Sequence, residues 1–218
     1  MFGIVEAVMR PQKQPQESRM SEPSEQSAPP DENPAGGAEA VLSFWFAPGR
    51  ERDWFMSSEQ FDAELRAAWL APHLAAAAGR LEHWRETPRG ALALVLLLDQ
   101  APRNLFRRTA RAFGCDRRAL RVSAAAVERA QDLALSPQER VFLYMPYQHA
   151  EDLAAQERSL ELFARLGADG DNAFAYAGKH HEIIKRFGRF PHRNAALGRA
   201  NTPDEEAYLS GAIERFGQ

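Results

Sequence analysis

A histidine and two acidic residues lie close together in the sequence MPYQHAEDLAAQ, residues 145–156. His149, Asp152 and Gln156 are spaced i, i+3 and i+7, which places them on one face of a helix that begins after Pro146. A histidine beside a carboxylate can transfer protons as an acid–base pair or bind a metal ion. Because the spacing matches neither HExxH nor a cysteine–histidine pattern, the sequence predicts no metal site here.

The same residues also have a structural interpretation. Glu151 and Asp152 are expected near the N-terminus of the following helix, where the helix dipole favours negative charge. His149 can cap that helix. Both interpretations stay open, and under the first one His149, Glu151 and Asp152 are the catalytic candidates.

The sequence FGRFPHRN, residues 187–194, contains more hydrogen-bond donors than a turn between two helices requires. Gly188 can end a helix in the left-handed conformation, and Pro191 restricts the next turn. The shape of the turn does not explain its four polar residues, which are Arg189, His192, Arg193 and Asn194. Guanidinium groups pair with carboxylates or phosphates, so the turn is predicted to contact acidic residues or an anionic ligand.

Asp99 follows the longest apolar run of the chain, ALALVLLL, and stands at the expected end of its helix, just before Pro102. The run predicts a buried helix, and a buried carboxylate requires a partner. We therefore expect Asp99 to be buried and to pair with Arg103 or with an arginine of residues 186–193. Such a pair can be purely structural or can form the wall of a binding site, for which Asn104 is a further candidate.

His180 lies on the apolar face of a helix predicted over residues 171–187. A single histidine on such a face is more often a satisfied core residue than a ligand. Because only two helical turns separate it from residues 187–194, His180 is also a catalytic candidate.

These three stretches are predicted to converge on one cluster around residues 187–194, because buried charges are tolerated in paired groups. Its acids are expected to be Asp99, Glu151 and Asp152, and its cations Arg103, Arg189 and Arg193. The predicted ligand-binding residues are Asp99, Arg103, Asn104, His149, Asp152, His180, Arg189, His192, Arg193 and Asn194.

From Ala38 onward the sequence predicts helices and no strands. No hairpin dipeptide separates alternating apolar runs, and β-branched residues do not cluster. The predicted fold is all-α, with about eight or nine helices in antiparallel helical hairpins. Helices are expected over residues 38–46, 57–78, 87–100, 116–132, 136–146, 150–166, 171–187 and 202–216, with N-caps at Ser57 or Ser58, Thr87, Asp116, Ser136 and Thr202.

The first part of the sequence has a different composition. Residues 10–37 are rich in proline, glutamine, serine and glutamate, and residues 1–40 hold three basic and seven acidic residues. Such a segment buries too little apolar surface to fold. The predicted organisation is a disordered acidic tail over residues 1–37, dispensable for folding, followed by one domain over residues 38–218.

The net charge of −3 leaves the predicted domain nearly neutral, which argues against a nucleic-acid binder. The longest apolar run is too short to span a membrane. Cys115 is the only cysteine, which fits a reducing compartment, and a cytoplasmic protein is expected. The sequence contains no glycine-rich phosphate loop and no GxSxG or CxxC motif, so no cofactor is predicted.

Three long stretches resemble a bacterial family of unknown function, domain of unknown function number nine hundred and twenty-four. They are LLLDQAPRNLFRRTARAFGCD (96–116), FLYMPYQHAEDLAAQ (142–156) and HHEIIKRFGRFPHRNAALGRANTPDEEAYL (180–209). The resemblance covers about residues 40–216 and implies a fold similar to tetratricopeptide-repeat proteins, with no known reaction. Ala101 and Ala150 depart from the family pattern, which has Phe and Ser there, so a mechanism that needs a hydroxyl beside His149 is disfavoured.

Three hypotheses follow for the function. The first is a binding module whose polar His/Asp/Arg pocket takes a peptide or a small anionic ligand. The second is a small-molecule hydrolase that uses His149 or His180 with Glu151 or Asp152. In the third, the polar cluster is a buried ion network that only holds the helices in register.

Overall fold

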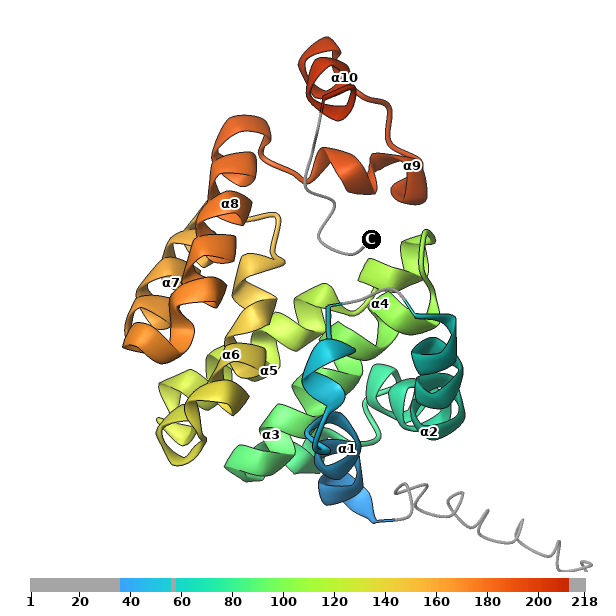
Figure 1. Cartoon of the computed structure of the whole chain (residues 1–218), viewed down its shortest axis with the longest axis vertical. Coiled ribbons are helices and arrows are strands. Elements are labelled where there is room, and N and C mark those ends of the chain that lie inside the picture. The colour runs from blue at the N-terminus through green and yellow to red at the C-terminus, as the bar shows by residue number, and fades with distance from the viewer. Residues whose placement is uncertain (1–35, 56–57, 212–218) are drawn as a thin grey trace, which may run out of the picture. The chain divides into compact units, whose positions relative to one another are not determined.

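The computed structural model describes residues 36–55 and 58–211. The chain divides into two units, Met1–Pro30 and Asp31–Gln218, and all described residues belong to the second. The tail predicted over residues 1–37 therefore lies outside the described residues, except for Gly36 and Gly37. In the described ranges every regular element is helical, which confirms the all-α prediction (Figure 1). A tetratricopeptide-like arrangement remains a prediction.

The helices follow one another with short connections. In chain order they are α1 (Gly37–Trp45), α2 (Glu59–Ala77), α3 (Pro88–Val95), α4 (Ala101–Leu105), α5 (Asp116–Glu128), α6 (Pro137–Gln148), α7 (Leu153–Ala164), α8 (Asp171–Phe187), α9 (Asn194–Leu197) and α10 (Pro203–Leu209). Successive helices from α5 to α8 pack against each other, as expected for helical hairpins. None of the helices in the described ranges is long and apolar enough to cross a membrane.

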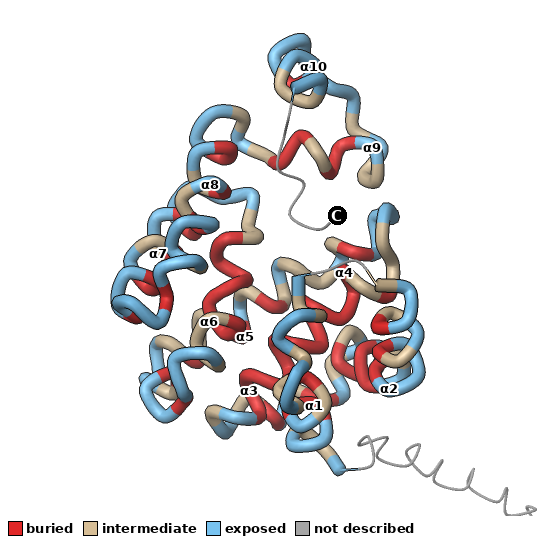
Figure 2. Tube along the Cα trace, viewed as in Figure 1, coloured by how far each residue is buried: buried red, intermediate tan, exposed pale blue. Residues whose placement is uncertain are grey.

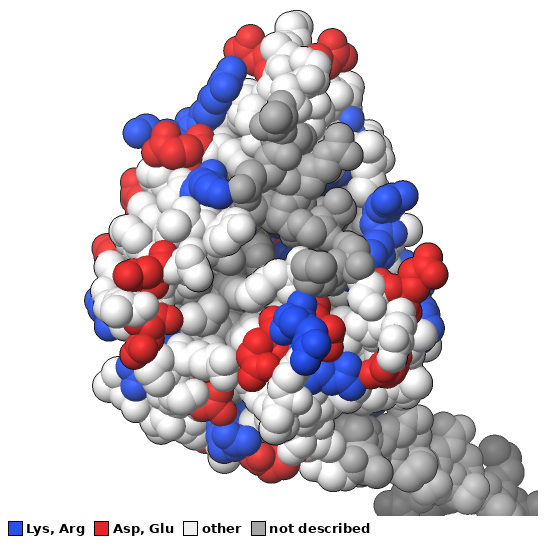
Figure 3. Space-filling view, in the orientation of Figure 1, with Lys and Arg blue, Asp and Glu red and all other residues white. Residues whose placement is uncertain are grey.

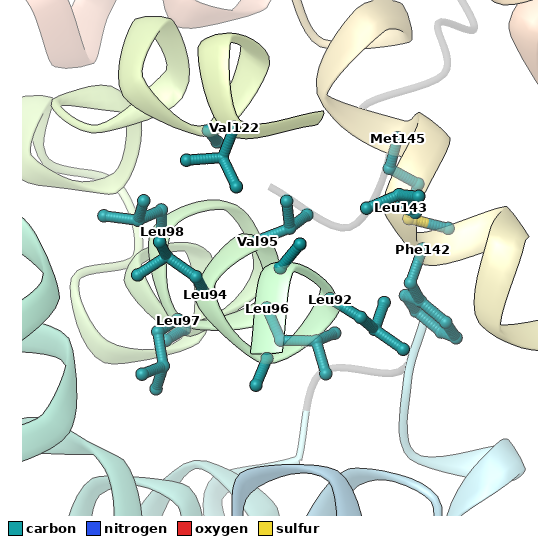
Figure 4. Packing of buried hydrophobic residues seen from close by; sticks show 14 of the residues in the cluster. Leu92, Leu94, Val95, Leu96, Leu97, Leu98, Val122, Phe142, Leu143 and Met145 are labelled. Carbon is teal, nitrogen blue, oxygen red and sulfur yellow. The ribbon is translucent and has the colours of Figure 1, made fainter. Parts of the chain in front are cut away.

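Helix α3 lies at the centre of the core, as its continuous apolar sequence predicts. It packs against α1, α5 and α6, and every residue from Gly90 to Gln100 is buried (Figure 2). Its side chains project on all sides, toward Val122 of α5 and toward Phe142 and Leu143 of α6 (Figure 4). The acidic and basic residues are instead interspersed over the surface seen in Figure 3.

Most of the predicted N-caps are confirmed. The side chains of Ser58, Thr87, Ser136 and Thr202 each accept a hydrogen bond from the first turn of the helix that follows. Gly188 ends α8 with a φ of 68°, the left-handed conformation that glycine adopts without strain. These ends depend on local chemistry, which is why the sequence predicts them.

The prediction that Pro102 ends the α3 helix is wrong. A π-helical turn, Leu96–Gln100 (η3), joins α3 directly to α4, and the Ala101 N–H donates to the Leu96 carbonyl. A proline ring inside an α-helix clashes with the carbonyl four residues earlier, and the wider π turn makes room for it. Asp99 consequently lies in the middle of a helical segment and not at its end.

Further boundaries differ from the sequence predictions, since α5 ends at Glu128 and not at residue 132, and α10 ends at Leu209 and not at residue 216. Pro146 does not break its helix, and α6 continues past it to Gln148. Helix α7 begins at Leu153 and not at residue 150, so His149 is not on that helix. Asp116 is the first residue of α5, whose N-cap position is taken by Cys115.

The residues after α8 build a second, smaller apolar cluster. Ile183, Ile184 and Phe190 are buried together, with Phe187 and Tyr208 packed against them. This cluster fixes the 187–194 turn at the end of α8. It thereby positions the polar residues of the turn.

Gly90 is expected to be essential for the packing of α3. A Cβ atom at this position would lie 2.2 Å from the Trp84 carbonyl oxygen and 2.8 Å from Thr87 Oγ1. Gly90→Ala should therefore reduce the free energy of unfolding by about 1–3 kcal/mol, as overpacking does.

Gly178→Ala in α8 is the matched control, because nothing lies within 4 Å of its added Cβ. It should stabilise the helix by about 0.5–1 kcal/mol. Urea unfolding of both variants measures the difference, and equal stabilities would contradict the packing argument.

Candidate functional site

Asp99 is fully buried in the π turn, and its carboxylate has three polar neighbours. His149 Nδ1 donates to both carboxylate oxygens at 2.9 and 3.0 Å, and Gln100 Nε2 donates at 2.6 Å. Arg103 Nη1 lies 3.4 Å from Oδ1, which confirms the predicted pairing with an arginine. Burial alone would raise the pKa of Asp99, but Arg103 and His149 together hold it well below its usual range. Asp99 is therefore ionised at neutral pH.

His149 follows the last turn of α6, where its backbone N–H donates to the Met145 carbonyl. Burial and the nearby Arg103 lower the pKa of His149, and they outweigh the opposite effect of Asp99. The imidazole is neutral at pH 7, with its proton on Nδ1, the nitrogen that faces the carboxylate. Its other nitrogen, Nε2, makes no hydrogen bond to a described residue, and the side chain is 11% exposed.

Asp116 joins two buried arginines from different parts of the chain. Arg103 donates to both of its oxygens at 3.0 and 3.1 Å, and Arg193 Nη1 donates to Oδ2 at 3.1 Å. The side chains of Arg103 and Arg193 are 9% and 6% exposed, and that of Asp116 is 13% exposed. This carboxylate is thus the main counter-charge for both guanidinium groups.

Arg193 lies between two aromatic rings. Its guanidinium carbon is 4.6 Å from the ring centre of Phe113 and 4.4 Å from that of Phe190. Its Nε atom is buried and has no hydrogen-bond partner among the described residues. Burial lowers the pKa of Arg193 to about 10, so the group is still protonated at neutral pH.

His180 lies between His149 and Phe190, with ring centres 5.8 and 5.5 Å away. Its Nδ1 donates to the Tyr176 carbonyl at 2.8 Å. Burial, followed by the proximity of His149, lowers the pKa of His180 to about 3. His192 packs on the other side of Phe190, at 5.5 Å, and burial lowers its pKa to about 3 as well.

These contacts form a closed chain that we call the central cluster. In order, its members are Asp99, His149, His180, Phe190, Arg193, Asp116 and Arg103, which returns to Asp99. They come from the π turn, α4, α5, the end of α6, α8 and the 187–194 turn. The predicted convergence of the three stretches is thereby confirmed for these residues, and His192 lies beside them.

Other candidates lie outside the central cluster. Asp152 caps α7 by accepting from the Ala155 N–H, so the predicted i, i+3, i+7 face with His149 is wrong. Arg189 pairs with Glu205, and Asn194 donates to Glu205 and Asn201. Asn104 donates to the Gln100 carbonyl and accepts from Arg107. Each of these side chains has a local structural role.

Glu151 does not pair with His149 either. Its carboxylate accepts from the Phe190 N–H at 2.8 Å and from Arg199 at 2.6 and 2.8 Å. Burial would raise its pKa, but Arg199 and the Phe190 N–H lower it overall. Glu151 therefore attaches the 187–194 turn to the segment between α6 and α7, and it positions Phe190.

The sequence does not predict two residues of the site, Asp116 of the central cluster and Phe113, which packs against Arg193. Asp116 has the sequence signal of an N-cap and was interpreted as one. Its position at the end of the stretch 96–116, which carries the family resemblance, is the signal that pointed to a further role. No group of three or more metal-ligating side chains occurs in the parts of the chain that the structure describes.

Comparisons with known proteins agree with this all-α domain. The family model "Bacterial protein of unknown function (DUF924)" matches residues 41–212. The solved structure of the protein of unknown function ATU0120 from Agrobacterium tumefaciens is 41% identical, with a TM-score of 0.76. The match covers 81% of this chain and 98% of that chain. Among the curated proteins none matches.

Proposed function

Because the chain belongs to the DUF924 family of bacterial proteins of unknown function, we propose its function from the central cluster itself. The protein is a binding module for a small anionic ligand, and Arg193 binds the carboxylate or phosphate group of that ligand. A bacterial cytoplasmic location accompanies this proposal, because the free Cys115 fits a reducing compartment.

The incomplete hydrogen bonding of Arg193 carries the proposal. A guanidinium group has five N–H donors, and a buried polar group without a partner is costly. Asp116 accepts a hydrogen bond from one nitrogen of Arg193, Nη1. The Nε atom of Arg193 is buried without a partner among the described residues. Both Asp116 oxygens also accept from Arg103, so the counter-charge is shared. Arg193 is therefore the cation of the cluster that is least compensated.

The aromatic neighbours of Arg193 favour an anion that binds through two oxygen atoms. Phe113 and Phe190 lie within 5 Å of its guanidinium carbon and restrain the orientation of the group. A restrained guanidinium fork matches the two oxygens of a carboxylate or phosphate. The three neutral histidines nearby add no positive charge that would compete with Arg193 for the anion.

The burial of the cluster favours a small ligand over a peptide segment. Its most exposed polar side chains, Asp116 and His149, are only 13% and 11% exposed. A flat peptide surface does not reach groups buried to this extent. A small molecule or a single carboxylate-bearing group fits the limited access better.

Titration calorimetry with inorganic phosphate and with succinate tests the proposal. We expect saturable binding of at least one of these anions to the full chain. Arg193→Lys keeps the positive charge but removes the two parallel N–H donors of the guanidinium group. It should weaken binding about 10- to 100-fold, which corresponds to one charge-assisted hydrogen bond. The matched control is Arg186→Ala, because Arg186 stacks on Phe187 outside the cluster and is exposed. Absence of binding by both anions would contradict the proposal.

A structural brace is the second candidate, and the charge balance favours it. Asp99 and Asp116 match Arg103 and Arg193 in formal charge, so the cluster is neutral without a ligand. In that case neither anion binds, and Arg193→Lys changes stability alone.

A further inference from the structure

The Asp99–His149 pair has the arrangement of a general base held by a carboxylate. We infer that His149 activates a water molecule, which attacks an acyl group of the ligand whose anionic end Arg193 binds. The central cluster is then a hydrolytic site for small anionic esters or amides. This inference rests on the proposed function, because Arg193 must first hold the ligand.

The orientation of His149 is fixed by a rigid, charged partner. Asp99 is held in the π turn by Gln100 and Arg103, and it has no exposed surface. Its carboxylate accepts a hydrogen bond from the Nδ1–H group. The lone pair on Nε2 is then the only basic position of the ring. A carboxylate placed in this way also stabilises the imidazolium that forms when Nε2 takes a proton.

The environment keeps His149 available as a base. Nε2 has no partner among the described residues, and the side chain reaches solvent with 11% of its surface. Since the pKa of His149 lies below its usual value, the neutral form dominates at pH 7. A π-helical turn such as the one that carries Asp99 is rare and frequently occurs at functional sites.

Water is the nucleophile, because no side chain of the cluster can take that role. Its seven members carry carboxylate, imidazole, phenyl or guanidinium groups, and none has a hydroxyl or a thiol. Cys115 precedes Asp116 in the chain, but burial raises the pKa of this thiol and disfavours the reactive thiolate.

The reaction needs only His149 to move the proton. Nε2 takes one proton from the water molecule while its oxygen forms a bond to the acyl carbon. The bond from this carbon to the alcohol oxygen or amine nitrogen then breaks, and the imidazolium gives the proton to that leaving atom. His180 cannot supply it, because its Nδ1–H donates to the Tyr176 carbonyl and the ring is neutral. The products are a carboxylic acid and an alcohol or amine, with no oxidant or reductant required.

Two activated esters distinguish this inference from simple binding. The full chain is assayed with mono-p-nitrophenyl succinate, which carries a carboxylate, and with neutral p-nitrophenyl acetate. We expect the anionic ester to be hydrolysed faster, and His149→Asn to lower its kcat by about 10²- to 10⁴-fold, the usual contribution of a general base. His181→Gln is the control, because His181 contacts Glu182 outside the cluster.

Asp99 acts through His149, so its variant is tested by the pH profile as well as the rate. Asp99→Asn should lower kcat. It should also shift the acid limb of the kcat/KM profile to lower pH, because it removes the carboxylate that raises the pKa of His149. The charged and titratable groups that face His149 are Asp99, Arg103, Asp116, His180 and His192. A variant that changes stability alone leaves the acid limb in place.

Chemical modification keeps the test decisive if a variant does not fold. Diethyl pyrocarbonate acylates accessible neutral imidazoles, so wild-type protein should be modified at His149, with loss of hydrolysis and protection by succinate. If neither ester is hydrolysed faster by the wild type than by His149→Asn, and His149 is not modified, the inference is overturned. Anion binding measured by calorimetry decides the proposed function separately. If Arg193→Lys lowers kcat/KM equally for both esters, the anionic substrate class is wrong.

Discussion

Lowering the pH from about 7 to about 4.5 is expected to reduce the free energy of unfolding by about 5 kcal/mol. In the folded protein, burial lowers the pKa values of His180 and His192 to about 3. The same groups titrate near pH 6.5 in the unfolded chain. Between these two values the unfolded state binds more protons, so stability falls as the pH falls. Below pH 6.5, each histidine lowers the free energy of unfolding by about 1.4 kcal/mol per pH unit. Over about two pH units, the two histidines together account for the expected loss.

Other groups in the chain act in the same direction. Burial also lowers the pKa values of His149 and His73, and their stabilising contribution is likewise lost as the pH falls. Asp99 and Glu151 have lowered pKa values, so their contributions disappear at still lower pH. The protein should therefore be most stable at neutral pH or above, and it should unfold in acid.

Urea unfolding at a series of pH values measures this dependence. Each of the variants His180→Gln and His192→Gln removes one titrating group. Each should therefore reduce the slope of the free energy of unfolding against pH by roughly 1.4 kcal/mol per pH unit. Gly178→Ala contains no new titratable group and should displace the whole curve without changing its slope. A stability that is constant between about pH 4.5 and 7 would show that these histidines are accessible to protons in the folded state.

The sequence predicts the helix starts that a capping box marks. Ser136 and Thr202 each have a proline after them and a glutamate three residues on, and both capping boxes form. The prolines were less informative. Pro102 and Pro146 both lie inside helical segments, and a wider turn accommodates Pro102. Whether a proline ends a helix depends on the packing around it, which the local sequence does not contain.

The convergence of charges was predictable, but the identity of the central carboxylate was not. Asp116 and Asp152 both lie near the start of a helical sequence, and the predicted N-caps are Asp116 for one helix and His149 for the other. Asp152 caps α7, whereas Cys115 takes the N-cap position of α5, and Asp116 is directed to Arg103 and Arg193. This shift of the N-cap by one residue places Asp116 in the central cluster instead of at the helix cap. The tertiary packing of α5 against the 187–194 turn decides between them.

Replacing Asp116 by alanine is expected to reduce the free energy of unfolding by about 3–5 kcal/mol, the usual result of leaving a buried charge without its partner. Arg103 would keep only Asp99 as a counter-charge, at 3.4 Å, and Arg193 would lose its one ion-pair contact. Asp62→Ala is the matched control. Asp62 also accepts two hydrogen bonds from one arginine, Arg107, but both side chains are 23% exposed. Its loss should cost about 1 kcal/mol or less, because solvent screens a partly exposed pair.

A second substitution distinguishes an orphaned charge from a simple loss of packing. Adding Arg193→Met to Asp116→Ala removes the unpaired guanidinium and leaves an apolar side chain between Phe113 and Phe190. If the unpaired charge causes the loss, the double variant should be more stable than Asp116→Ala, because apolar groups can replace a buried ion pair without loss of stability. If the two changes instead add as independent losses, the arginine is stabilised by its aromatic neighbours and not by Asp116. Urea unfolding of the two single variants and the double variant at neutral pH gives the coupling energy directly.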